Sequence, residues 1–158
     1  MHSVYLVLGS NIDPDGNIPK ALDQLGEDLQ LLEISSAWRT VPVGTEGPHF
    51  VNLAAHVASD LGRTDLKTRI LQKIENRLGR IRTSDKFAPR TVDIDIILFD
   101  GELIEKELAS TAYLILPLSE LLPDYVPPGT NRSLIQMAAL DTIRCQAVRL
   151  DYFPRSLC

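Results

Sequence analysis

The stretch Lys86–Phe99 reads KFAPRTVDIDIILF and places a polar loop directly before a strand that carries two carboxylates. Because side chains alternate across a strand, Asp93 and Asp95 leave the same face, with their Cα atoms roughly 6.6 to 6.8 Å apart. Two acids side by side on a sheet repel each other and favour a counter-cation. A pair of Mg²⁺ ions bridging to phosphate oxygens would supply that charge. The alternative is a solvated polar edge of a strand.

A cluster of basic residues precedes the acid pair. Four cations lie within an eleven-residue segment of an otherwise acidic chain: Arg80, Arg82, Lys86 and Arg90. Arginine side chains present forked donors that match phosphate oxygens, so the cluster predicts a triphosphate site. The alternative is that these are solvated charges that pair loosely with Asp85 and Glu75.

The composition is that of one soluble domain spanning residues 1–158, with 44% hydrophobic and 23% charged residues. The net charge of −5 argues against nucleic-acid or anionic-membrane binding. No apolar run approaches a membrane span, and no signal segment stands at the amino terminus. Cys145 and Cys158 form neither a disulfide framework nor a zinc-ligand pattern. We therefore expect a cytoplasmic monomer.

The order of secondary structure predicts an α+β fold. Strands are expected at residues 3–8, 31–39, 50–58 and 91–99, with one helix capped by Asn17 and a second from Thr64 to Gly79. This β-α-β-β-α-β order is the ferredoxin-like arrangement, an antiparallel sheet packed with helices. A short strand at residues 102–104 and helices at 117–122 and 133–140 would extend the core.

A second candidate site lies on the strand 50–58. Asn52 is a polar residue among apolar neighbours and offers both a donor and an acceptor, which suits the edge of a heterocycle. Phe50 points to the same face and is placed to stack on such a ring. The loop that begins at Thr40 precedes them. The alternative is an asparagine at the sheet edge beside a core phenylalanine.

In chain order these elements resemble the 6-hydroxymethyl-7,8-dihydropterin pyrophosphokinase family. The resemblance covers about residues 1–135, and its last motif is close to diagnostic. The motifs are Gly9-Ser10-Asn11, Arg39-Thr40 with Pro42 and Gly44, Phe50-x-Asn52, Gly79-Arg80-x-Arg82, and Ala88-Pro89-Arg90-x-x-Asp93-Ile94-Asp95-Ile96. The resemblance implies an ATP-dependent transferase of folate biosynthesis, which moves pyrophosphate to the pterin hydroxymethyl group and releases AMP.

The resemblance also implies roles for individual residues. Two Mg²⁺ ions would be held around the ATP phosphates by Asp93 and Asp95, which with Arg82 and Arg90 form the catalytic set. ATP would be bound by Glu75, Arg80, Arg82, Lys86, Arg90 and Ile96. The pterin would be bound by Thr40, Val41, Val43, Phe50, Asn52 and Tyr113, with the rings of Phe50 and Tyr113 on its two faces.

One segment departs from the family pattern. Residues 107–113 read ELASTAY, several residues shorter than in the family and without the His and Arg that contact ATP there. Losing a charge-assisted phosphate contact costs about 1.5 to 3 kcal/mol. We expect an active, Mg²⁺-dependent pyrophosphokinase. Two alternatives remain open: a catalytically impaired homologue that binds pterin or nucleotide without turnover, and a two-metal phosphohydrolase that shares only the acid pair.

Overall fold

The computed structural model describes residues 1–40, 49–80 and 91–150. Its centre is a seven-stranded sheet with the order β6-β5-β1-β4-β3-β7, in which β2 also pairs with β4. All of these pairs are antiparallel. The strands are β1 (His2–Ser10), β2 (Gln30–Ile34), β3 (Ala37–Thr40), β4 (Phe50–Ser59), β5 (Asp93–Phe99), β6 (Glu102–Leu103) and β7 (Ala147–Leu150).

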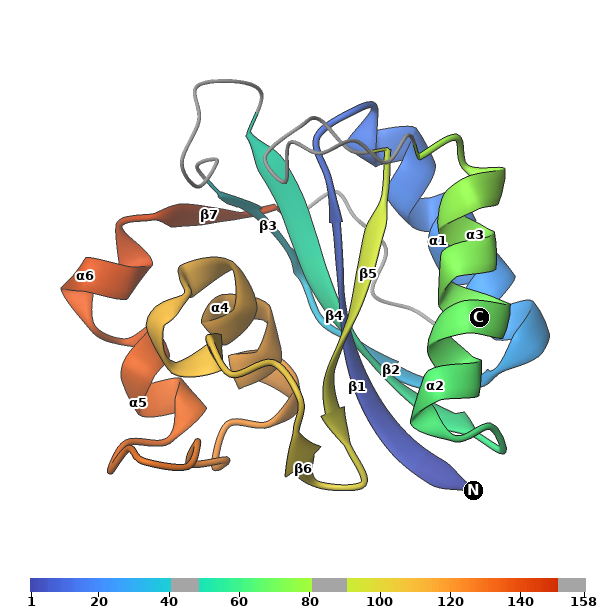
Figure 1. Cartoon of the computed structure of the whole chain (residues 1–158). Coiled ribbons are helices and arrows are strands. Elements are labelled where there is room, and N and C mark those ends of the chain that lie inside the picture. The colour runs from blue at the N-terminus through green and yellow to red at the C-terminus, as the bar shows by residue number, and fades with distance from the viewer. Residues whose placement is uncertain (41–48, 81–90, 151–158) are drawn as a thin grey trace.

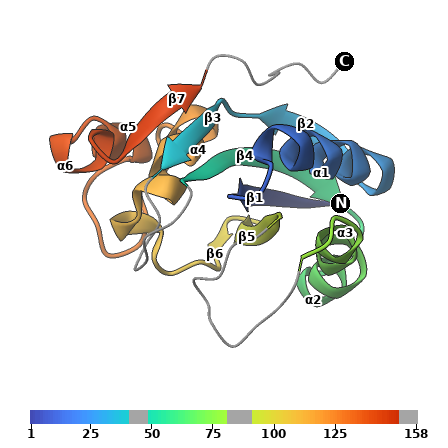
Figure 2. The same ribbon diagram turned by 90° about the horizontal axis from the view of Figure 1, so that it is seen from above.

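Helices cover both faces of the sheet (Figures 1 and 2). One face carries α1 (Pro14–Asp28) and a continuous helical stretch made of α2 (Arg63–Asp65), the π-helical η1 (Leu66–Leu71) and α3 (Gln72–Arg77). The other face carries η2 (Leu108–Ser110), α4 (Ala112–Leu121), α5 (Leu134–Ala138) and α6 (Asp141–Arg144). The expected β-α-β-β-α-β core with added C-terminal elements is confirmed.

Alternation along β1 divides the hydrophobic core into two layers. Leu6 and Leu8 are buried against α1 and the helical stretch, whereas Val7 is buried with the residues of α4. In the β1–β5 register Val7 lies opposite Asp95, and Gly9 lies opposite Asp93. Residues directly opposite in a sheet share a face, so both carboxylates lie on the α4 side.

Several element boundaries differ from those expected. The strand predicted over residues 31–39 is two strands, because Ser35 and Ser36 are buried and form hydrogen bonds with the distant residues Ala54 and Glu120. The Ser35 hydroxyl donates to Ser36 O at 2.7 Å and accepts from Ala54 N at 2.8 Å. Asn17 does not cap the first helix, which begins at Pro14; its side-chain amide donates to Ile12 O at 2.6 Å.

The helix expected over residues 117–122 begins earlier, at Ala112. Pro117 therefore lies inside it, where the ring cannot donate to the carbonyl four residues back. Burial of Leu114, Ile115 and Leu118 against the sheet outweighs that loss. As a result Tyr113 lies in the first turn of α4. Within the described ranges, no helix is long and apolar enough to cross a membrane.

Candidate active site

A row of residues crosses the α4 face of the sheet where β5, β1 and β4 run side by side. Asp93 lies opposite Gly9, and Gly9 lies opposite Asn52. Gly9 has no side chain, and a Cβ placed there would lie 2.6 Å from Asn52 Oδ1 and 3.8 Å from Phe50 Cδ1. The row therefore has an acidic end and an amide end, separated by a glycine whose missing side chain leaves room for the Asn52 amide.

The amide end joins three of the predicted pterin-site residues. The Asn52 side-chain amide donates to Thr40 Oγ1 at 2.9 Å, and both residues are buried. Phe50 pairs with Thr40 across the β3–β4 ladder and is half-buried. This bond fixes the orientation of the Asn52 amide and leaves its carbonyl oxygen directed over Gly9. Val41 and Val43 lie outside the described residues.

The acidic end holds two carboxylates in electrostatic conflict. Burial is the main cause that raises the pKa of Asp95 to about 7, and the Asp93 carboxylate raises it further. The ammonium group of Lys67 acts in the opposite direction, and the more distant Glu75 and Glu105 add to the rise. An ionised pair at this position therefore needs a cation to be stable.

Arg80 supplies part of that positive charge. Its guanidinium donates to Asp93 Oδ1 at 2.8 Å and to the carboxylate of Glu75. Glu75 is 3% exposed and also accepts from the Ile94 N–H at 3.4 Å. Arg80 follows Gly79, whose φ of 86° turns the chain out of the helix toward β5. The predicted ATP-site residues Glu75 and Arg80 thus meet directly at the acid pair.

The donor set fits a hard divalent cation. In residues 1–40, 49–80 and 91–150 there is no group of three or more His, Cys, Asp and Glu side chains that would enclose a metal. Mg²⁺ does not require such a cage, because it binds through one or two carboxylates together with phosphate oxygens and water. Asp93 and Asp95 provide that number of carboxylates, and their mutual repulsion is what a bound cation would relieve.

A cavity of about 230 Å³ opens at Asp95, between the helical stretch, β5 and the segment that follows β6. Its lining includes Asp95 and the predicted ATP-site residue Ile96. The other lining residues are Arg63, Thr64, Lys67, Thr68, Ile104 and Glu105.

Tyr113 approaches the same region from α4. Burial raises the pKa of Tyr113 to about 12, and the nearby charge of Asp95 contributes to this rise. Its hydroxyl is therefore neutral and lies within electrostatic range of the acid pair. The fold thus brings Tyr113 within range of the charge of Asp95, although the two residues are eighteen positions apart in the chain.

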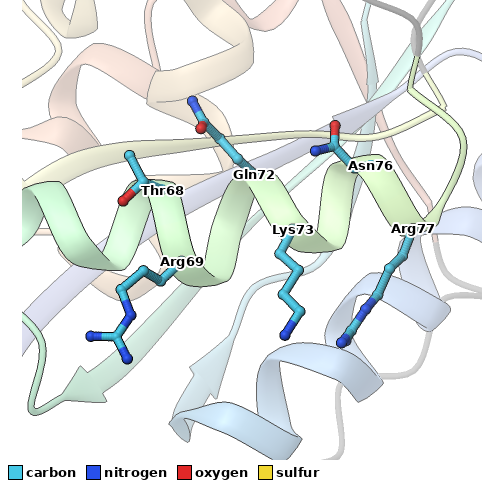
Figure 3. Close-up of a pocket in the computed structure, with 6 residues that line it drawn as sticks. All are labelled: Thr68, Arg69, Gln72, Lys73, Asn76 and Arg77. Carbon is cyan, nitrogen blue, oxygen red and sulfur yellow. The ribbon is translucent and has the colours of Figure 1, made fainter.

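A second, open hollow of about 670 Å³ lies on the surface of the helical stretch and contains none of the predicted site residues (Figure 3). Arg69, Lys73 and Arg77 extend to one side of the helix, whereas Gln72 and Asn76 extend to the other (Figure 3). Thr68 lines both this hollow and the cavity beside Asp95.

The predicted site is only partly covered by the described residues, since Arg82, Lys86 and Arg90 lie outside them. Sequence reasoning did not identify Lys67 or Thr68 as residues near the acid pair. The available signal was the four-residue spacing of Arg63 with Lys67 and of Thr64 with Thr68, which places each pair on one side of a helix.

Comparisons with known proteins identify the family. A family model described as 7,8-dihydro-6-hydroxymethylpterin-pyrophosphokinase (HPPK) matches residues 5–123. The 2-amino-4-hydroxy-6-hydroxymethyldihydropteridine pyrophosphokinase of Pseudomonas aeruginosa is 34% identical over 141 residues, which cover 81% of this chain and 86% of that protein. The protein of the same name from Synechocystis is 28% identical over 158 residues, covering 93% of this chain and 79% of that protein.

Solved structures show the same fold. Plasmodium falciparum HPPK-DHPS with SDX-DHP matches with a TM-score of 0.68 and 13% identity over 94% of this chain. An HPPK-DHPS in complex with substrates matches with a TM-score of 0.65 and 12% identity over 86% of this chain. The chain spans about half the length of these proteins, covering 47% and 42% of them. At such identities the similarity shows the fold alone.

The fold and the family match together define the class, an α+β transferase of the pyrophosphokinase type. The chain belongs to the 7,8-dihydro-6-hydroxymethylpterin-pyrophosphokinase family, as its motifs predicted, and is thereby a pyrophosphokinase of folate biosynthesis.

Proposed function

We propose that this chain transfers pyrophosphate from ATP to the hydroxyl of 6-hydroxymethyl-7,8-dihydropterin and releases AMP, with two Mg²⁺ ions held at Asp93 and Asp95. The observation that carries this proposal is the row Asp93–Gly9–Asn52. It combines an acidic end suited to cation-bound phosphates with an amide end suited to a heterocycle. The glycine between them leaves room for the Asn52 carbonyl oxygen, which would meet the edge of a flat ring.

The amide end would bind the pterin. Asn52 Oδ1, directed over Gly9, would accept a hydrogen bond from the ring edge, while its amide nitrogen is held by Thr40. Phe50 would stack on one face of the ring and Tyr113 on the other. Val41 and Val43 would complete the pocket with backbone contacts.

The acidic end would hold the phosphates. When bound, Mg²⁺ would neutralise the charge of the triphosphate at the reacting phosphorus. Arg80 bonds to Asp93 and to buried Glu75, which supports holding the Asp93 carboxylate in one orientation. Arg82, Lys86 and Arg90 would bind phosphate oxygens, and Ile96 would contact the nucleotide from the adjoining cavity.

The reaction needs positioning and charge neutralisation rather than a nucleophilic side chain. The pterin hydroxyl would attack the β-phosphorus in line and release its proton to solvent water. A new P–O bond would form, the bond between the α-phosphate oxygen and the β-phosphorus would break, and AMP would leave with the electrons of that bond. The absence of a candidate general base in the sequence motifs is consistent with this chemistry. We further propose that residues 1–158 act as one domain and as a cytoplasmic monomer.

The test is to follow AMP formation by purified protein with ATP, MgCl₂ and 6-hydroxymethyl-7,8-dihydropterin. AMP that appears only when both pterin and Mg²⁺ are present supports the proposal. Tight pterin binding without AMP would contradict it and identify an impaired homologue. Phosphate release from ATP without pterin would instead identify a phosphohydrolase.

A further inference from the structure

The cavity beside Asp95 has a basic wall that the predicted site does not use. Arg63 and Lys67 lie four positions apart on the helical stretch, and both line the cavity. Across the cavity lie β5 and the segment after β6, represented by Asp95, Ile96 and Ile104. Two exposed cations therefore line the same cavity as Asp95, the residue at which the phosphates of ATP would be held.

Among the described residues, no ion-pair partner is found for either of these cations. In the part of the chain that the structure describes, ion pairs within 4.0 Å involve Arg80, His2 and His56, but not Arg63 or Lys67. Arg80, by contrast, forms ion pairs with Glu75 and Asp93. Of the described residues that line this cavity, Arg63 and Lys67 are the cations, and both are exposed to a ligand.

Lys67 and Asp95 line the same cavity, so the ammonium group lies near one member of the acid pair. The cavity also contains one opposing charge, Glu105, whose carboxylate accepts from the backbone N–H of Glu107 at 3.2 Å. With a cation bound at Asp95, the charge remaining in the cavity is positive on balance, which favours an anion.

Two threonine hydroxyl groups, those of Thr64 and Thr68, also line the cavity. Thr68 donates to the carbonyl of Thr64 at 2.9 Å, so its proton is already committed. Thr64 also lines the cavity, and its hydroxyl is a donor suited to a phosphate oxygen. The wall therefore presents two cations and one hydroxyl donor, a combination that fits a polyphosphate better than a neutral ligand.

We propose that Lys67 and Arg63 bind the triphosphate of ATP from the helix side, as phosphate-binding residues of the same active site. The inference rests on the proposed pyrophosphokinase function. It also accounts for how a chain whose segment 107–113 contains no cation can hold the nucleotide.

The test compares ATP-site and pterin-site binding in Lys67→Ala, Arg63→Ala and the double variant. The probe is Mg²⁺ with α,β-methylene-ATP, in which carbon replaces the oxygen of the bond that would break, measured by calorimetry. We expect its Kd to rise about tenfold in Lys67→Ala, the size of one lost charge-assisted bond, and further in the double variant. The Kd for the pterin should stay within twofold, and Lys67→Arg should restore nucleotide binding.

The matched control is Lys73→Ala, an exposed lysine on the same helical stretch that lines the outer hollow and not the cavity (Figure 3). Its Kd for the nucleotide should match that of the unaltered protein. Because both lysines are exposed, both variants should unfold at the parent temperature.

The outcomes separate this inference from the proposed function. If the parent protein forms AMP and Lys67→Ala and the double variant bind the analogue as Lys73→Ala does, the inference is overturned and the function stands. If the parent binds the analogue but forms no AMP, the function fails, while selective loss in Lys67→Ala still supports the phosphate-binding role.

Discussion

At the scale of single residues, the space above Gly9 is the most sensitive point of the site. Gly9→Ala would place a methyl group 2.6 Å from Asn52 Oδ1, and the buried Asn52 amide is held by Thr40. We expect a loss of about 1 to 3 kcal/mol in unfolding free energy, together with loss of pterin binding. Chemical denaturation and calorimetry would measure the two effects.

Gly26→Ala is the matched control, because no atom lies within 4 Å of a Cβ added at this helical position. It should be neutral or stabilising by about 0.5 to 1 kcal/mol. If Gly9→Ala behaved in the same way and still bound pterin, the ring could not lie over Gly9.

A substitution at Asn52 distinguishes the binding of pterin from the binding of ATP. Asn52→Ala removes the proposed acceptor for the pterin edge but leaves the acid pair in place. We expect pterin binding to weaken by about 1 to 2 kcal/mol, roughly 5- to 30-fold, with ATP binding within twofold. Calorimetric titration with each substrate checks this expectation. Equal losses for both would indicate a general defect in folding.

Asp95 links the site to the pH dependence of stability. The folded protein holds a proton on Asp95 up to about pH 7, since its pKa is raised to about 7, whereas the unfolded chain releases it near pH 4. Its stabilising contribution is therefore complete below pH 4 and is lost as the pH rises through 7. Asp95→Asn should be more stable than the parent by about 1 to 3 kcal/mol at pH 8, with a smaller difference at pH 4.5.

Urea unfolding in EDTA at both pH values measures that difference, and Asp60→Asn, at an exposed position, is the control. The Asp95 variant should also lose all turnover. A stability difference that is equal at the two pH values would contradict the account of the acid pair.

At the scale of elements, Glu120 anchors α4 to the sheet. Its carboxylate accepts from Ser36 N at 3.1 Å, from the Ser36 hydroxyl at 2.8 Å and from Trp38 Nε1 at 2.8 Å. Because Ser36 is buried, Glu120→Ala would leave the hydroxyl and backbone N–H of Ser36 without their acceptor. We expect a loss of about 1 to 3 kcal/mol in unfolding free energy.

The measurement is denaturant unfolding, with Glu27→Ala on the exposed side of α1 as the control. Tyr113 lies seven positions before Glu120 in α4, so release of this helix should also weaken pterin binding. Equal unfolding midpoints for Glu120→Ala and Glu27→Ala would show that the three bonds do not hold α4.

The sequence predicted which helices and strands are present better than it predicted the residues at which they begin and end. The run of β-prone apolar residues in Val4–Leu8 and the helical spacing in Leu66–Leu78 predicted the core strands and helices, because these patterns are local. The break at Ser35–Ser36 depends on bonds to Ala54 and Glu120, which are distant in sequence. The early start of α4 depends on burial against the sheet, and β7 on pairing with β3; no local pattern contains either contact.

At the scale of the whole molecule, the sheet register turns separate motifs into one site. The sequence predicted that Asp93 and Asp95 share a face, and likewise Phe50 and Asn52, because alternation within a strand is a local property. It did not predict that Gly9 lies between the two pairs, since that follows from the register of β1 with β4 and β5. The same holds for the approach of Lys67 to Asp95 across the cavity.

The most direct test of the central claim is identification of the products by ³¹P NMR after turnover of ATP with 6-hydroxymethyl-7,8-dihydropterin and MgCl₂. Attack at the β-phosphorus predicts pterin diphosphate and AMP in equal amounts, with neither formed by Asp95→Asn. ADP with a pterin monophosphate, or free phosphate without a pterin ester, would contradict the account.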